Sequence, residues 1–262
     1  MSRLAGRRAL VTGASSGIGE AYARALHALG CPLVLVARRE ERLRALAGAL
    51  GGDVQVVPAD LTSEGAPRRV YDEVQARGLA IDVLVNNAGV GHTGPFHQEP
   101  PAALEGMLDL NARAAMMMTR LFLPAMVERR QGVVVNVVST SAFQPVPFLA
   151  VYGASKAFLL SLTEALATEV EGSGVQIQAL CPGLTATEFQ GVAGTDRVLF
   201  NRTGSMTPAA VVAASLRGVE RGKLRVVPGL SNRLTAALVP FTPGWLVRRM
   251  GATLFRPRPQ GH

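Results

Sequence analysis

Short apolar runs alternate along this chain with longer stretches in which apolar residues recur at helical spacing. The apolar runs are typical of buried strands, and they cover residues 8–12, 32–37, 54–57, 82–85, 132–138, 175–180 and 224–227. Helical spacing lies between them, at about 18–29, 63–77, 101–130 and 152–171, and Ser63 is the expected N-cap of the second helix. Strands that alternate with helices predict an α/β fold with a parallel sheet and helices on both faces.

Glycines and polar residues gather where the predicted strands end. These positions hold Gly13–Gly19, Arg38, Asp60, Asn87, Ser139 and the pair Pro182-Gly183. Because ligands of parallel α/β sheets bind beyond the carboxyl ends of the strands, the coincidence predicts one ligand site along that edge. An Asn pair such as Asn86-Asn87 is also typical of a simple turn, so the interpretation depends on the whole set.

Tyr152 and Lys156 are four residues apart at the head of a predicted helix, so they share one helix face. A free tyrosine titrates near ~10, and a neighbouring cation favours the ionised form, which lets a phenol exchange protons near neutral pH. Ser139 follows a buried strand, where its hydroxyl could hold a substrate carbonyl oxygen. Tyr-x-x-x-Lys also arises by chance. However, Lys156 and Lys223 are the only lysines among 27 Lys and Arg residues, which favours a specific use of this ammonium.

A glycine-rich segment, Gly13-Ala-Ser-Ser-Gly17-Ile-Gly19, joins the first strand to the first helix. Glycines at such a turn let the backbone approach a ligand, and the following helix N-terminus offers free N–H groups to a phosphate. The spacing Gly-x-x-x-Gly-x-Gly is weak by itself, and a plain tight turn is the alternative. In its strand–turn–helix context it favours a dinucleotide.

The second strand ends in Ala37 and is followed by Arg38 and Arg39. An acidic residue at this strand end would accept hydrogen bonds from a ribose 2′-hydroxyl, as NAD requires. Ala37 stands at that position, and the next residue, Arg38, suits a 2′-phosphate, which favours NADP(H) over NAD(H). The alternative is that both arginines are solvated charges at the start of a helix, beside Glu40 and Glu41.

The composition is that of a globular protein, with 48% hydrophobic and 18% charged residues in 262. The net charge of +8 lies in the tail, because residues 217–262 hold nine Lys or Arg and one acid, Glu220, whereas residues 1–216 are balanced. No secretory leader or transmembrane run is recognisable. Two cysteines and four unclustered histidines predict neither a disulfide framework nor a metal site. We therefore expect a soluble cytoplasmic protein with a single domain over residues 1–262.

Together these segments resemble the short-chain dehydrogenase/reductase family over roughly residues 5–228. The residues that carry the resemblance are Thr12-Gly-x-x-x-Gly17-Ile-Gly19, Asn86-Asn-Ala-Gly89, Asn111, Ser139, Tyr152-x-x-x-Lys156 and Pro182-Gly183. The resemblance implies a Rossmann-type, doubly wound parallel sheet of about seven strands in a three-layer α/β/α sandwich. It also implies reversible hydride transfer between NAD(P)(H) and a carbonyl/alcohol pair.

By this resemblance, Tyr152 is the general acid in reduction, Ser139 holds the carbonyl oxygen, and Asn111 anchors a water for proton relay. Lys156 binds the nicotinamide ribose and lowers the pKa of the phenol. The cofactor-binding residues implied are Gly13, Ser15, Ser16, Gly17, Ile18, Gly19, Arg38, Asp60, Leu61, Asn87, Ala88, Gly89, Tyr152, Lys156, Pro182, Gly183, Thr185 and Thr187. Family members are usually dimers or tetramers that pair the helices at 101–130 and 152–171. The run Met116–Met118 would then pack in the core or at that contact.

A glycine-containing apolar loop at 184–205 is interpreted as a flap over the substrate. With Phe143 and Phe148 on the other side, it predicts a hydrophobic carbonyl substrate of medium to large size. The alternative is that these aromatic residues pack the core whatever the ligand. A rival to the enzyme is a dinucleotide-binding regulatory or scaffold protein, which the presence of Ser139, Tyr152 and Lys156 disfavours. Nucleotide-sugar epimerases share Tyr-x-x-x-Lys, but they carry a longer C-terminal domain and a different glycine spacing.

The tail at 229–262 is a basic amphipathic extension in which Trp245, Leu246 and Met250 interleave with Arg248 and Arg249. Three uses remain open: packing on a neighbouring subunit or over the site, peripheral contact with an anionic membrane, and nucleic-acid binding. Nucleic acid is the least favoured, because an even cationic stripe with base-stacking aromatic residues is absent.

Overall fold

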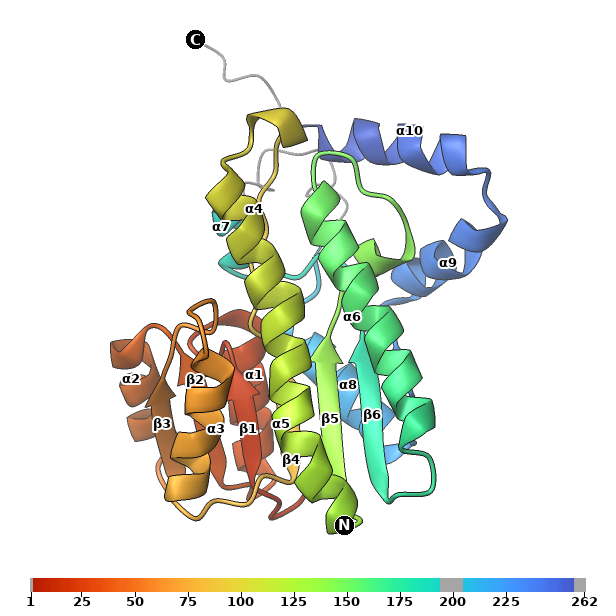
Figure 1. Ribbon diagram of the computed structural model, residues 1–262. Helices are drawn as coiled ribbons and strands as arrows, with labels where there is room; N and C mark the ends of the chain where they lie inside the picture. Colours follow the sequence, from red (N-terminus) through yellow and green to blue (C-terminus); the bar gives the residue numbers. More distant parts are fainter. Residues whose placement is uncertain (1, 194–204, 257–262) are drawn as a thin grey trace.

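The computed structural model describes residues 2–193 and 205–256, and its centre is a parallel sheet of seven strands in the order β3-β2-β1-β4-β5-β6-β7 (Figure 1). The strands are β1 (Ala9–Thr12), β2 (Leu33–Ala37), β3 (Val54–Pro58), β4 (Val83–Asn86), β5 (Gly132–Val137), β6 (Val175–Leu180) and β7 (Arg225–Val226). All residues of β1, β2, β4 and β5 are buried, as expected for strands covered on both faces. The strand order reverses between β1 and β4, which confirms the doubly wound prediction.

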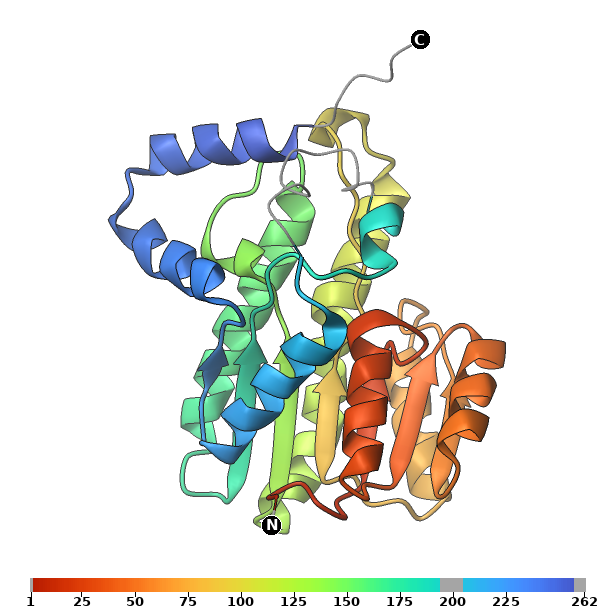
Figure 2. The same ribbon diagram turned by 180° about the vertical axis from the view of Figure 1, so that it is seen from behind.

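Helices cover both faces of the sheet and separate two cores. On one face lie α1 (Gly17–Ala28), α2 (Glu40–Leu50) and α8 (Pro208–Glu220), which pack Tyr22, Leu43 and Val211 against β1 and β2 (Figure 2). On the other face lie α3 (Ala66–Ala76), α5 (Ala115–Glu128) and α6 (Ala150–Glu169) (Figure 1). Alternate strand residues point to opposite cores, because successive side chains of a strand face opposite sides.

The predicted start of one helix needs correction. The helix predicted over 63–77 begins only at Ala66, and its N-cap is Gly65, in a left-handed conformation (φ 67°), not Ser63. Asp60 causes the delay: its carboxylate accepts hydrogen bonds from the Thr62 N–H (3.0 Å) and hydroxyl (2.7 Å), which holds the chain in a turn. The helical region predicted at about 101–130 is confirmed, and it consists of α4 (Pro101–Leu108), a π-helical segment (Asp109–Ala114) and α5 in direct succession.

Short elements and a C-terminal arm lie above the carboxyl edge of the sheet. The short elements are the 3-10 turns η1 (Phe96–Gln98) and η3 (Thr140–Phe143) and the helix α7 (Phe189–Val192). The arm consists of α9 (Leu230–Leu238), the turn η6 (Val239–Phe241) and α10 (Gly244–Phe255). Both views show the arm standing away from the sheet layers, with α10 passing above the first turn of α6 (Figures 1 and 2). Among the described residues, no helix is both long and apolar enough to span a membrane.

Candidate functional site

The glycine segment after β1 forms the floor of a cleft at the carboxyl edge. Gly13 and Gly17 have φ of +66° and +58°, values that side chains rarely tolerate. A Cβ on Gly13 would lie 2.7 Å from Asn87 Nδ2 and 2.9 Å from Ala88 Cα. No side chain caps the first turn of α1, so its N–H groups face the cleft without a side-chain acceptor. The segment therefore offers bare backbone and a helix N-terminus, as an anionic pyrophosphate requires.

Thr12 joins this segment to the loop after β4. Its buried hydroxyl accepts hydrogen bonds from the N–H groups of Asn87 (2.9 Å) and Ala88 (3.0 Å), and Asn87 Nδ2 donates to the Thr12 carbonyl (2.9 Å). Asn86 is directed into the core, where Nδ2 donates to Asn136 Oδ1 at 2.8 Å. The two adjacent asparagines thus have separate tasks: Asn86 ties β4 to β5, and Asn87 shapes the wall of the cleft.

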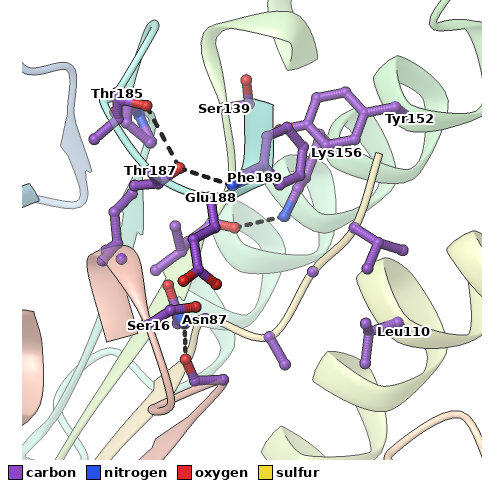
Figure 3. A pocket seen from close by; sticks show the side chains of 18 of the residues that line it. Ser16, Asn87, Leu110, Ser139, Tyr152, Lys156, Thr185, Thr187, Glu188 and Phe189 are labelled. Atoms are coloured by element: carbon purple, nitrogen blue, oxygen red, sulfur yellow. Dashed lines mark hydrogen bonds between the residues drawn. The ribbon is translucent and has the colours of Figure 1, made fainter. Parts of the chain in front are cut away.

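Lys156 lies beneath the middle of the cleft. Its side chain comes from α6, its residue exposure is 4%, and Nζ donates to the Val137 carbonyl at 2.8 Å. Figure 3 shows this bond, with Tyr152 and Ser139 from α6 and the end of β5 nearby. Nζ is 5.9 Å from the centre of the Tyr152 ring. The predicted i, i+4 pair therefore shares one helix face, as the spacing required.

Burial has the largest influence on the pKa values of this pair. Burial raises the pKa of Tyr152, and the hydrogen bond with the Ser139 side chain lowers it only in part. Burial is thus the largest influence on the pKa of the phenol, and the expectation that Lys156 lowers that pKa stays a prediction. Burial itself lowers the pKa of Lys156 to about 8, because an ammonium loses its hydration in the interior.

Asn111 lies behind the wall of the cleft. It is 1% exposed and sits in the π-helical segment between α4 and α5. Its Oδ1 accepts from Val90 N–H (2.8 Å), and its Nδ2 donates to the Val90 carbonyl (2.8 Å) and to Ser155 Oγ (3.2 Å). These bonds hold the chain around Gly89, where an added Cβ would lie 3.1 Å from Asn111 and 3.4 Å from Lys156. Asn111 supports the site, and its role as a water anchor stays a prediction.

Charged residues stand at the other end of the cleft. Arg38 lines it with a side chain that is 63% exposed and 3.7 Å from Asp60. Arg39 reaches over the glycine segment and donates to Ser16 Oγ at 2.8 Å and to Ser15 Oγ at 3.1 Å. Sequence reasoning missed Arg39, because a second arginine at the start of a helix is no different from a solvated charge. Only the fold turns it back onto the two serines.

Glu188 was also missed, and it connects this end to the segment before α7. Its carboxylate accepts from Arg39 (2.8 Å) and from Arg42 (2.6 Å), and these two hydrogen bonds lower its pKa. Figure 3 shows the carboxylate directed toward Ser16 and Asn87. The pairing comes from chain segments about 150 positions apart, so no local pattern could have found it.

The cleft has a volume of about 360 Å³ and brings the predicted residues together. All of the predicted catalytic and cofactor-binding residues line it except Gly19 and Asn111, which lie behind its wall. Gly19 is required for packing, because a Cβ there would lie 2.2 Å from the Gly13 carbonyl oxygen. Apolar residues complete the end near Tyr152, and they are Val90, Leu110, Leu149, Phe189 and Phe255.

Phe255 is the unexpected member of this apolar wall. It ends α10, is 6% exposed, and packs with Val146 and Leu149 beside Tyr152. Packing of the tail over the site was one of the three uses left open by its sequence, which does not single out Phe255. The flap predicted over 184–205 is only partly described: Leu184–Ala193 lies along the cleft, and residues 194–204 fall outside the described residues.

The residues of the cleft fit a dinucleotide along its length. The capless helix N-terminus and bare glycines suit the pyrophosphate, and Ser15, Ser16 and the two arginines suit a further phosphate. At the other end, a buried ammonium and two hydroxyls lie close to an apolar wall. This arrangement can hold a carbonyl oxygen and deliver a proton to it.

Comparisons with known proteins agree with this geometry. The family model described as short chain dehydrogenase matches residues 7–197. A short chain dehydrogenase of Pseudocercospora fijiensis is 37% identical over 192 residues, which cover 71% of this chain and 62% of that protein. The very-long-chain 3-oxoacyl-CoA reductase of Anas platyrhynchos is 33% identical over 92% of this chain and 75% of its own length. Among solved structures, a short-chain dehydrogenase from Sphingobium yanoikuyae in complex with NADPH has a TM-score of 0.81 and 36% identity, covering 88% of this chain and 92% of that one.

Proposed function

The chain belongs to the short-chain dehydrogenase family, and on that premise we propose that it is an NADP(H)-dependent oxidoreductase that interconverts a hydrophobic carbonyl compound and a secondary alcohol. The family supports the coarser statement, an NAD(P)-dependent oxidoreductase acting on a carbonyl/alcohol pair. The observation that supports the finer proposal is the difference between the two ends of the cleft. A Tyr152–Ser139–Lys156 group and an apolar wall lie at one end, and two arginines lie at the other.

Proton transfer falls to Tyr152. In reduction its hydroxyl donates to the substrate oxygen while Ser139 holds that oxygen in place, and in oxidation the phenolate takes the proton back. The nicotinamide, when bound, supplies the hydride. Lys156, with a pKa of about 8, lies beside the phenol, with Nζ 5.9 Å from the centre of its ring. Burial of Tyr152 keeps the phenol protonated at rest, which is the form that reduction needs.

The preference for NADP(H) rests on Arg38 and Arg39. A 2′-phosphate carries about two negative charges and is bound best by paired guanidinium groups. No acid stands at the end of β2, where a ribose 2′-hydroxyl would be recognised. Titration of the protein with NADPH and with NADH, followed by fluorescence, tests this preference. Equal affinity for the two cofactors would contradict it.

The proposal of a hydrophobic substrate rests on the residues beside Tyr152. Leu149, Phe189 and Phe255 come from three separate elements and close this end of the cleft with apolar surface. The avian relative is named as a reductase of very-long-chain 3-oxoacyl-CoA, which is compatible with such a pocket. Because the side chains of Leu149, Phe189 and Phe255 offer no hydrogen bond to a sugar, we expect polar ketones to react poorly.

NADPH oxidation across a panel of aliphatic, aromatic and acyl-chain ketones tests the reaction and the substrate class together. Turnover of hydrophobic ketones that is lost in Tyr152→Phe would support the proposal. Activity restricted to small polar ketones or sugars would contradict the substrate class. NADPH binding without turnover on any ketone would favour the rival, a regulatory dinucleotide-binding protein.

We further propose that the protein works in the cytoplasm as a homo-oligomer and that its C-terminal arm makes peripheral contact with a membrane. Buried free thiols at Cys31 and Cys181 suit a reducing compartment. For the oligomer, Phe158 on α6 is 44% exposed and Val127 on α5 is 37% exposed, on the helices expected to pair. Light scattering of the wild type and of Phe158→Glu tests this contact. A monomeric wild type would contradict it.

A further inference from the structure

Exposed apolar side chains are concentrated on the C-terminal arm. Of the eleven large hydrophobic residues exposed in the described part of the chain, six lie between residues 230 and 250. Their exposures are 72% for Leu230, 56% for Leu234, 61% for Leu238, 86% for Phe241, 61% for Trp245 and 54% for Met250. Leu230, Leu234 and Leu238 recur every four residues and therefore form one stripe of α9. An apolar patch on that scale marks an interaction surface.

The charge of the arm points to the partner. No acidic residue follows Glu220 in the sequence, whereas Arg233, Arg248, Arg249 and Arg256 are exposed on the arm. A second copy docked face to face would bring these arginines together without any acid on either arm to balance them. An anionic lipid surface satisfies both properties at once, since it accepts apolar side chains and attracts arginines.

The opposite face of the arm forms part of the cleft. Val247, Gly251 and Phe255 recur every four residues along α10 and are all buried. A Cβ on Gly251 would lie 3.0 Å from Pro147 Cδ, so α10 packs closely on the loop before α6. Phe255 continues this contact into the apolar wall beside Tyr152. One helix therefore has an exposed basic and apolar side and a buried side that reaches the substrate end of the cleft at Phe255.

We propose that the arm, residues 230–256, docks on an anionic membrane and that the enzyme takes its carbonyl substrate from the lipid phase. The proposal rests on the reductase function proposed above and names the source of the substrate. A ketone dissolved in the bilayer would reach the cleft along α10, without crossing open water. Arg233, Arg248 and Arg249 set the attraction to lipid headgroups, and Trp245 and Phe241 enter the interface.

Trp245 makes docking directly measurable, because it is the only tryptophan in the chain. The full-length protein is mixed with two kinds of vesicle, one of phosphatidylcholine alone and one that also contains about 30% phosphatidylglycerol. The anionic lipid gives the second kind a negative surface potential. We expect a blue shift of the tryptophan emission and co-sedimentation with the anionic vesicles only, both weakened by salt. Arg248→Glu/Arg249→Glu should reduce vesicle affinity by about tenfold or more, because each charge near the surface contributes to binding.

A matched control makes the same charge change elsewhere. Arg44→Glu/Arg68→Glu alters exposed arginines of α2 and α3, far from the arm, and should bind vesicles like the wild type once net charge is taken into account. If both double variants lost binding equally, attraction would be due to net charge alone and the docking face would be wrong. A blue shift that depended on protein concentration without vesicles, with a doubled mass, would show a second copy on this face and overturn the proposal.

Kinetic measurements separate the failure of this proposal from the failure of the proposed function. Turnover of a long-chain ketone carried in vesicles should rise several-fold on anionic vesicles for the wild type and the control, but not for Arg248→Glu/Arg249→Glu. A short, water-soluble ketone should be turned over equally by all three proteins with or without vesicles. Absence of turnover with every ketone would contradict the reductase function itself. Equal turnover of the long-chain ketone on both vesicle types would contradict only the lipid route.

Discussion

The two ends of the cleft are built on opposite principles. At the catalytic end Lys156 is 4% exposed and Ser139 is 8% exposed, and each side chain has a defined hydrogen-bond partner. At the other end, beside the glycine segment, the side chains of Arg38, Arg39 and Glu188 are 63%, 42% and 50% exposed. Burial sets the chemistry of the first end, because it changes pKa values. At the second end the number of charged side chains determines how strongly an anion is attracted, because water and salt screen each single interaction.

The largest effect is expected at the buried end, from Tyr152→Phe. The variant keeps the ring and loses only the hydroxyl that we propose transfers the proton, so kcat should fall by about 10²–10⁴-fold. NADPH affinity should stay within about twofold, since the lost group is a proton donor. Steady-state kinetics and a fluorescence titration measure the two quantities. A kcat close to that of the wild type would remove Tyr152 from the reaction.

Lys156→Met should abolish turnover and yet stabilise the fold at neutral pH. The pKa of Lys156 is lowered from 10.5 to about 8, which corresponds to a burial cost of about 3 kcal/mol for the charged form. The variant also loses the hydrogen bond from Nζ to the Val137 carbonyl, which lowers its free energy of unfolding by about 1–2 kcal/mol. We expect a net gain of about 1–2 kcal/mol, measured as the free energy of unfolding at pH 7.

The pH dependence of that gain follows from the direction of the pKa shift. Below pH 8, Lys156 is protonated in both the folded and unfolded states, so the wild type bears the full cost. Between pH 8 and about 10.5 the folded protein has released this proton and the unfolded chain has not, so wild-type stability recovers as pH rises. The difference between variant and wild type should shrink over that range. A variant less stable than the wild type at pH 7 would show that the hydrogen bond outweighs desolvation.

An intermediate effect is expected at the exposed end, from Arg39→Ala. Loss of one guanidinium beside a 2′-phosphate should weaken NADPH binding by about 10–100-fold and leave NADH binding unchanged. Arg38→Ala should cost less, because Arg38 is the more exposed of the two and is held only by Asp60 at 3.7 Å. Titrations at low and high salt measure both. A larger loss from Arg38→Ala would restore the sequence prediction that Arg38 is the principal phosphate contact.

The smallest effect is expected from Glu188→Gln, which keeps the shape of the side chain and removes its charge. We expect Glu188 to compete with a 2′-phosphate for Arg39, so NADPH should bind about twofold to fivefold more tightly to the variant, the range of an exposed ion pair. Affinity for NADH should not change. Isothermal titration of both cofactors decides the point, and weaker NADPH binding would show that Glu188 orients Arg39 instead of competing for it.

The sequence alone determined the architecture and the positions of the site. Seven apolar runs predicted the strands, and alternation with helices predicted the parallel sheet, because strands buried on both faces must be apolar throughout. The residues at the strand ends then had to meet at one edge, which is why nearly all of them line the cleft. Tyr152 and Lys156 were predictable together since helix geometry places i and i+4 on one face.

Only the tertiary structure decided the electrostatics and the long-range partners. The pKa values of Tyr152 and Lys156 depend on burial, which no local pattern reports and which raises the first value and lowers the second. The pairing of Glu188 with Arg39 and the entry of Phe255 into the apolar wall join segments more than one hundred residues apart. Such contacts are set by how the layers pack, and packing is a property of the whole chain.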